Sequence, residues 1–234
     1  MYVTLVEEVL RELYIDKIGQ AGWWDRMKGD IADAFRDGQQ YCGTAFLTEL
    51  INQFAGVAVP PRITLVGHSA GAIYICNLLK AAAQLAPSLH FDIIFEAPAA
   101  THALLASTVA LHGSRISNFR QIGMSDEREA ADALVPVLYL SSLLYFISSM
   151  LEHDTDEPLV GMARYLDKQD IYNADAFPNI ESCRLFYARY TNSLVWSFSD
   201  AGPGFRSNGR HHDEFDDVDP PTLDSVQHIL LNGY

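Results

Sequence analysis

The sequence predicts an α/β fold with a mostly parallel sheet flanked by helices. Short apolar runs rich in β-branched residues alternate with segments of helical periodicity, which is the pattern of βαβ units. The chain has 234 residues, of which 49% are hydrophobic, and this is enough for one sizeable core. We therefore expect a single domain over residues 1–234.

The first sixty residues are expected to form a helical lead-in. Apolar residues recur at helical spacing in 1–20, 24–35 and 46–54. The third helix should end near Gly56, and Pro60-Pro61 then breaks the chain. No strand pattern occurs before this break, so the sheet should begin only after residue 60.

Strands and helices alternate after the break. The apolar run 63–66 predicts a buried strand, and 72–86 predicts a helix. A helical segment over 124–180 is expected between the late strands, with one helix along the apolar run 135–151. A last helix should begin with Thr222 as its cap. The other predicted strands are 91–95, 118–122, 184–190 and 193–198.

Composition excludes several classes of protein. Thirty acidic residues against 16 basic ones give a net charge of −14, which argues against partners such as nucleic acid or an anionic membrane. The run 135–151 carries four serines and a proline and is short for a membrane span. The N-terminus lacks the features of a signal peptide, so a cytoplasmic protein is expected. Cys42, Cys76 and Cys183 form no CxxC pair, which predicts buried thiols in a reducing compartment.

The stretch Gly67-His68-Ser69-Ala70-Gly71 carries the clearest functional signal. It matches G-x-S-x-G and lies between a predicted strand and a predicted helix. A nucleophilic serine here needs a tight, strained turn, and side chains at positions 67 and 71 should collide with the strand or the helix. The Ala70 amide, at the start of the helix, can donate to an oxyanion. The alternative is a glycine-rich turn whose serine only caps the helix.

This stretch resembles the nucleophile elbow of the α/β-hydrolase superfamily. The resemblance runs from about residue 63 to the C-terminus, and the elbow is its only specific motif. It implies a catalytic triad in the chain order Ser, acid, His. The acid follows a later strand, and the His lies in a loop after the last strand. No cofactor or metal is implied.

Asp126 is the predicted acid. It lies two strands beyond the elbow strand, where the resemblance places the acid. Asp126, with Glu129 three residues later, also fits a helix N-cap with a capping-box partner, and the two roles are compatible. Asp200, in the loop after the final strand, is the alternative acid.

His212 is the predicted base, and His211 is the alternative. Both lie in the loop between the last strand and the last helix. Phe215 is the large apolar residue of this loop, so it should be driven into the core. His212, one turn earlier, would then point inward and His211 towards solvent. His68 adjoins the serine but is expected to face away from it. The run HHDEFDD has no known metal-ligand spacing, so no metal site is expected.

The chain departs from the family before the elbow. Several strands precede the elbow in α/β-hydrolases, and a loop after one of them, often HGG, supplies a second oxyanion amide. Here that region reads as helices without HGG. The sheet is therefore expected to be truncated on its N-terminal side, because the natural protein is longer or because it is a shortened form. The exposed sheet edge should invite a partner or a homodimer.

These expectations combine into a serine hydrolase acting on an ester or related acyl bond of a small molecule. Ser69 attacks, His212 moves the proton, Asp126 orients the histidine and the Ala70 amide stabilises the oxyanion. The alternative is a non-catalytic binding or assembly module that retains the fold, because fold alone does not determine function.

Overall fold

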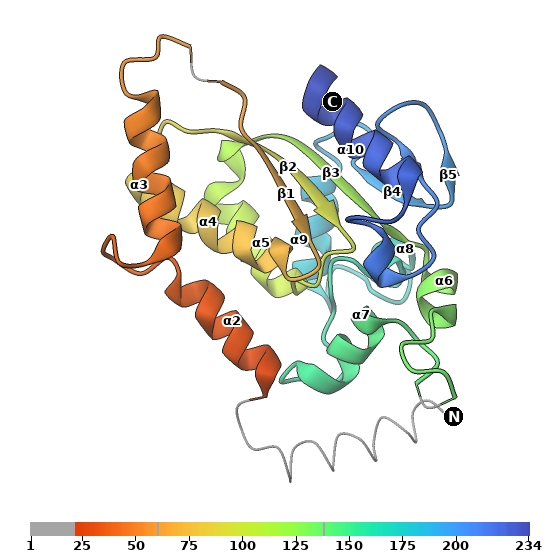
Figure 1. The fold of residues 1–234 in the computed structure, drawn as a ribbon. Coiled ribbons are helices and arrows are strands. Elements are labelled where there is room, and N and C mark those ends of the chain that lie inside the picture. The colour runs from red at the N-terminus through yellow and green to blue at the C-terminus, as the bar shows by residue number, and fades with distance from the viewer. Residues whose placement is uncertain (1–21, 60, 138) are drawn as a thin grey trace.

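A computed structural model describes residues 22–59, 61–137 and 139–234, and it contains a four-stranded parallel sheet (Figure 1). The strands lie in the order β1-β2-β3-β4, and each pairs in parallel with its neighbour. The predicted α/β fold with a parallel sheet flanked by helices is confirmed. The strands are β1 (Thr64–His68), β2 (Phe91–Glu96), β3 (Ile116–Met124) and β4 (Leu194–Ser197).

Two hydrophobic clusters join the sheet to its helices. The larger one packs Phe95 and Phe119 of the sheet against α4 (Gly71–Leu85), α5 (His102–His112) and α9 (Pro178–Tyr187). The smaller one packs the ends of β3 and β4 around Phe215, beside α10 (Pro220–Asn232). The shorter elements are η1 (Gly113–Arg115), α6 (Asp126–Ala131), α7 (Leu143–Phe146), η2 (Ile147–Leu151), α8 (Ala163–Asp167), β5 (Ser199–Asp200), β6 (Arg206–Ser207) and η3 (His212–Glu214).

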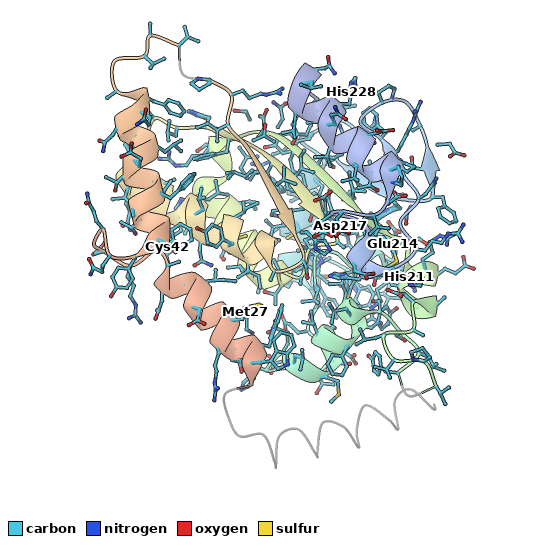
Figure 2. The ribbon with its side chains drawn as sticks, viewed as in Figure 1. Met27, Cys42, His211, Glu214, Asp217 and His228 are labelled. Atoms are coloured by element: carbon cyan, nitrogen blue, oxygen red, sulfur yellow. The ribbon has the colours of Figure 1, made fainter. Side chains whose placement is uncertain are left out.

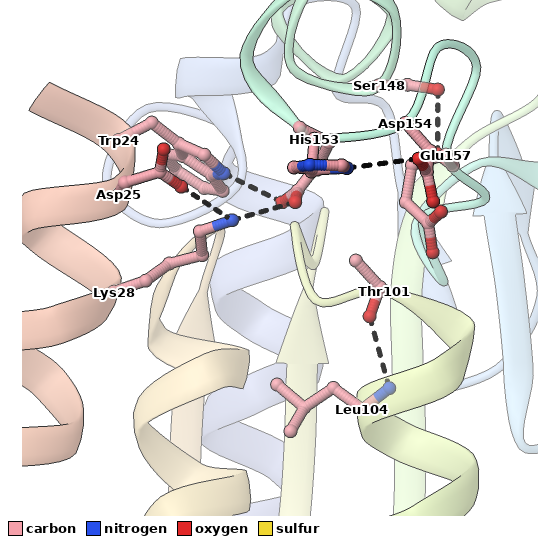
Figure 3. A network of polar contacts seen from close by, with 10 residues as sticks. Trp24, Asp25, Lys28, Thr101, Leu104, Ser148, His153, Asp154 and Glu157 are labelled. Atoms are coloured by element: carbon pink, nitrogen blue, oxygen red, sulfur yellow. Dashed lines mark hydrogen bonds and ion pairs between the residues drawn. The ribbon is translucent and has the colours of Figure 1, made fainter. Parts of the chain in front are cut away.

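The lead-in before the sheet is helical in its described part. Residues 22–59 form α2 (Trp23–Asp33) and α3 (Cys42–Phe54) and contain no strand. The helix expected over residues 1–20 lies outside the described residues. Figure 3 shows how α2 is held: the Trp24 indole and the Lys28 ammonium each donate to one oxygen of Glu152, both at 2.7 Å. This shared carboxylate fixes α2 against the end of η2.

β1 lies at an edge of the sheet, as expected for a sheet that begins at the elbow strand. Among the described residues it pairs with β2 alone, in the register Thr64 opposite Asp92 through His68 opposite Glu96. The strand expected over 63–66 is present but is not buried as expected, because it lies at the edge: Val66 is 42% exposed, which is unusual for an apolar residue in a parallel strand. In the described residues, no helix is both long enough and apolar enough to span a bilayer.

Two predicted elements differ from the structure. The strand expected over 184–190 is wrong, because most of that stretch belongs to α9, which begins at Pro178 and buries Ile180, Cys183 and Phe186 at helical spacing. The helix expected over 135–151 forms only from residue 143 onward, as α7 and the π-helical η2. Its first half folds back through a bridge between Val135 and Tyr139.

Smaller expectations are corrected as well. α10 is capped by Asp219, whose side chain accepts from the Thr222 amide, and not by Thr222 itself. The proline at the first position of α10 favours this earlier start. Cys76 and Cys183 are buried as expected, whereas Cys42, labelled in Figure 2, is exposed at the start of α3.

Candidate active site

Ser69 occupies a strained turn between β1 and α4. Its φ is +52°, in the left-handed region that side chains other than glycine seldom adopt. Two backbone hydrogen bonds fix this conformation: the Ser69 amide donates to Glu96 O at 2.9 Å, and the Ala99 amide donates to Ser69 O at 2.9 Å. The turn therefore has the backbone that a nucleophile elbow requires.

The two glycines of the motif differ in how strictly they are needed. A Cβ at Gly67 would lie 2.7 Å from Ile75 Cδ1 and 2.9 Å from the backbone of Gly71, so a side chain does not fit there. A Cβ at Gly71 would meet no atom of the described residues within 4 Å, apart from its chain neighbours and the backbone of its own helix. The expected collision is therefore present at position 67 and absent at position 71.

His212 meets the serine. Its Nε2 lies 2.9 Å from Ser69 Oγ, across 143 residues of sequence. The side chain belongs to η3 and is only 6% exposed. Phe215, three residues later, is fully buried beside Gly209 and anchors this segment in the smaller core cluster. The geometry expected from the spacing of these two residues is present.

His211 points away from the serine. Its Nδ1 lies 2.6 Å from Asp132 Oδ1, and its side chain is more than half exposed. Glu214 accepts from the His211 amide, and Figure 2 shows both side chains on the segment before α10. The two neighbouring histidines therefore have different environments, one against Ser69 and one at the surface.

Burial sets the protonation state of His212. Desolvation, helped by the neighbouring His68, lowers the pKa of His212 to about 3. The ring is therefore neutral at pH 7, which is the form that can accept a proton from Ser69. With Nε2 accepting, the ring proton is on Nδ1, and Nδ1 is buried without a hydrogen-bond partner among the described residues.

The structure does not bring Asp126 to His212. Asp126 directly follows β3 and Ser125, at the start of α6. Its Oδ1 accepts from Tyr145 Oη at 2.8 Å, and its Oδ2 pairs with Lys168 Nζ at 2.5 Å. The N-cap of α6 is Ser125 and not Asp126.

The other expected partners of Asp126 and His212 lie elsewhere. Glu129, the expected capping-box partner, is fully buried and accepts from the Ser142 hydroxyl. Asp200 is exposed in β5, which pairs with β6. The described residues thus place no carboxylate on Nδ1 of His212.

Two residues outside the predicted triad hold the histidine segment. His68 Nε2 donates to the His212 carbonyl at 2.9 Å, and its Nδ1 lies 3.3 Å from Asp216. Asp132, the C-cap of α6, accepts from the His212 amide at 3.1 Å as well as contacting His211. His68 could be noticed from its place beside the serine. No sequence pattern marks Asp132, because its partners lie about 80 residues away.

Ala70 is the N-cap residue of α4, next to Ser69. Amides at the start of a helix have no carbonyl partner within that helix, so they are available to an anion. Among the described residues, no group of three or more His, Cys, Asp or Glu side chains is arranged to hold a metal ion.

No family model matches the chain, and it has no match among curated proteins or solved structures. The comparisons therefore assign no family to the chain, and the structure supports an α/β fold with a four-stranded parallel sheet.

Proposed function

We propose that the protein is a serine hydrolase that cleaves an ester or a related acyl bond of a small molecule. The observation that carries the proposal is the 2.9 Å contact between His212 Nε2 and Ser69 Oγ. A serine on a left-handed turn, within reach of a neutral and buried imidazole, is the arrangement that activates a hydroxyl for attack.

The reaction follows from these positions. Ser69 Oγ attacks the carbonyl carbon, and its proton passes to His212 Nε2. The Ala70 amide donates to the oxyanion of the tetrahedral intermediate. The imidazolium then protonates the leaving alcohol, which departs and leaves an acyl group on Ser69. Water, deprotonated by His212, attacks this acyl group and releases the carboxylic acid.

Turnover is expected to be slow. Burial disfavours the charged form of His212, and Nδ1 has no carboxylate partner among the described residues. The imidazolium that forms during attack is therefore poorly stabilised. Loss of the orienting carboxylate costs about 10⁴-fold in kcat in a well-studied triad enzyme. We propose Asp126 as the orienting acid. In that role its carboxylate would have to leave Tyr145 and Lys168 and form a hydrogen bond with Nδ1 of His212.

A fluorophosphonate probe tests the proposal, because it labels an activated serine without requiring complete turnover. We expect labelling of the wild-type chain, none of Ser69→Ala and strongly reduced labelling of His212→Gln. His90→Gln and Ser182→Ala are matched controls, since His90 and Ser182 are exposed and make no contact with the histidine segment in the described part of the chain. Full labelling of Ser69→Ala would refute the proposal.

The second candidate is a non-catalytic binding or assembly module. The observation that favours it is that Nδ1 of His212 has no hydrogen-bond partner among the described residues. A serine and a histidine without an orienting acid can persist in a protein that has lost its catalytic activity. Absence of labelling in a folded wild-type chain, with no hydrolysis of short p-nitrophenyl esters, would support this candidate.

We further propose a cytoplasmic location and self-association through β1. None of the three cysteines, all in the described part of the chain, forms a disulfide, and this fits a reducing compartment. The β1 edge carries the exposed Val66 and offers its outer backbone groups to another strand. A homodimer across this edge would cover both.

A further inference from the structure

A cavity lies at the other end of the sheet from Ser69. Its volume is about 590 Å³. β4 begins opposite Gln121, whereas β3 begins at Ile116, so the first residues of β3 have no partner on the β4 side among the described residues. The cavity occupies the place where a longer β4 would continue. Among its lining residues are Asn118, Arg120, Arg189, Tyr190, Phe205 and Tyr234.

Arg120 is the unusual group of this cavity. Its side chain is 2% exposed, yet no carboxylate of the described residues lies within ion-pair distance of it. Nη1 donates to the Gly204 carbonyl at 2.6 Å, and Nε is buried without a partner among the described residues. A guanidinium keeps its charge in proteins, so this positive charge is buried without a carboxylate partner among the described residues. Such a charge is costly unless an anion accompanies it.

The charge of the cavity is opposite to that of the chain. Two arginines, Arg120 and Arg189, line it, and none of the described side chains that line it is acidic. This happens in a chain with 30 acidic and 16 basic residues. Asp92, the nearby buried carboxylate, is already held by the Asn118 amide at 2.9 Å and by Arg62 at 3.6 Å. The cavity is therefore a positive site within an acidic protein.

Aromatic rings form the walls beside the charge. The Phe205 ring lies 3.9 Å from Arg120 Cζ, and the Tyr234 ring lies 5.5 Å from it. Tyr234 is fixed by its hydroxyl, which donates to Ile93 O at 2.6 Å. Phe119 and Tyr190 add two further rings. Apolar walls around a few polar groups are typical of small-molecule sites, and the volume is in the range of such sites.

We propose that this cavity binds a small organic carboxylate with an apolar or aromatic body. One buried guanidinium matches one negative charge, and a guanidinium can bind the two oxygens of a carboxylate together. The rings then contact the body of the ligand. A phosphate dianion without such a body would leave the aromatic walls unused. This site does not depend on the proposed hydrolase activity, because Ser69 and His212 lie at the opposite end of the strands.

The competing explanation is that Arg120 has a purely structural role, linking β3 to the 204–205 turn through Gly204 and Phe205. In that case the cavity holds only solvent, and no anion should bind with a preference for its charge. The two explanations differ in what a carboxylate does to the wild-type protein.

Calorimetric titration tests the proposal with three compounds. These are benzoate, benzyl alcohol as the uncharged analogue of benzoate, and inorganic phosphate. We expect one saturable site for benzoate, binding about 10- to 100-fold weaker for benzyl alcohol, and weaker binding of phosphate than of benzoate. Equal binding of benzoate and benzyl alcohol, stronger binding of phosphate, or no saturable benzoate binding at concentrations of about 10 mM would overturn it.

Variants locate the site. Arg120→Gln should weaken benzoate binding at least about tenfold, whereas Arg36→Gln, an exposed arginine on the lead-in, should leave it unchanged. Hydrogen exchange of the wild-type chain is the independent measurement if Arg120→Gln does not fold. Benzoate should slow exchange in residues 117–120, 189–191 and 204–206. Protection confined to other segments, or unchanged binding by a folded Arg120→Gln, would refute the assignment.

Discussion

Asp132 should control both the stability of the histidine segment and the reactivity of Ser69. Its carboxylate contacts His211 Nδ1 at 2.6 Å and accepts from the His212 amide at 3.1 Å, and its side chain is buried. One side chain at the end of α6 thus holds the segment that brings His212 to Ser69. We therefore predict that Asp132→Asn destabilises the fold and slows labelling of Ser69 by a fluorophosphonate.

The magnitude follows from the two contacts. Replacing a charged acceptor by a neutral one at the buried His212 amide should cost about 1–1.5 kcal/mol. The pair with His211 is half exposed and contributes about 0.2–1 kcal/mol after solvent screening. Asp132→Asn should therefore lower the free energy of unfolding by about 1–2.5 kcal/mol.

The pH dependence has a definite sign. The hydrogen bond to Asp132 is the largest cause that raises the pKa of His211 above its ordinary value of 6.5. A group whose pKa is raised by folding stabilises the fold fully below its unfolded pKa and loses this contribution as the pH rises through its folded pKa. The stability difference between wild type and Asp132→Asn should therefore shrink as the pH rises above about 6.5.

Urea unfolding at several pH values measures both effects. Asp213→Asn is the matched control, because Asp213 lies in the same segment and is exposed. It should change stability by less than about 0.5 kcal/mol. Equal stability of wild type and Asp132→Asn at pH 6, or a difference that grows with pH, would refute this reasoning.

Three further predictions concern the elbow, the anchor and the edge. Gly67→Ala should destabilise the fold by about 1–3 kcal/mol because its Cβ meets Ile75 and the backbone, whereas Gly71→Ala should be neutral or slightly stabilising. Thermal unfolding compares the two variants, and equal losses of stability would contradict the steric argument. Phe215→Ala should lower the free energy of unfolding in urea by about 3–5 kcal/mol, and Leu231→Ala, at an exposed position, should lower it by less than about 0.5 kcal/mol. A small loss of stability for Phe215→Ala would show that Phe215 does not anchor the histidine segment. Val66→Asp should weaken self-association in sedimentation velocity, and a wild-type chain that stays monomeric at high concentration would exclude the dimer.

Sequence patterns predicted the strands that are bounded by clear breaks. β1 and β2 follow from the short apolar runs 63–66 and 91–95, which end near glycine, proline or polar residues. The stretch 184–190 misled because it is short and its apolar residues fit both strand and helix periodicity. Its helical state is decided by Pro178 at the start and by packing against α5, which a local pattern does not contain.

The candidate site was predictable where its geometry is local. Ser69 is defined by five consecutive residues, and the inward position of His212 follows from Phe215, three residues away. The surroundings of Asp126 were not predictable in the same way. Its contacts with Tyr145 and Lys168 depend on how the segment after α6 folds back over the site. Contacts of this kind are set by tertiary packing, so the sequence could place the residue after β3 but not choose its partner.

The parallel sheet explains why the two proposed sites lie apart. In a parallel sheet the carboxyl ends of all strands lie on the same side, so the segments after β1, β3 and β4 carry Ser69, Asp126 and His212 to that side. The amino ends of the strands lie on the opposite side. There β4 begins later than β3, and this leaves Arg120 beside a cavity instead of beside a neighbouring strand. A ligand at Arg120 therefore touches none of the residues at Ser69, and the two sites can be tested by independent substitutions.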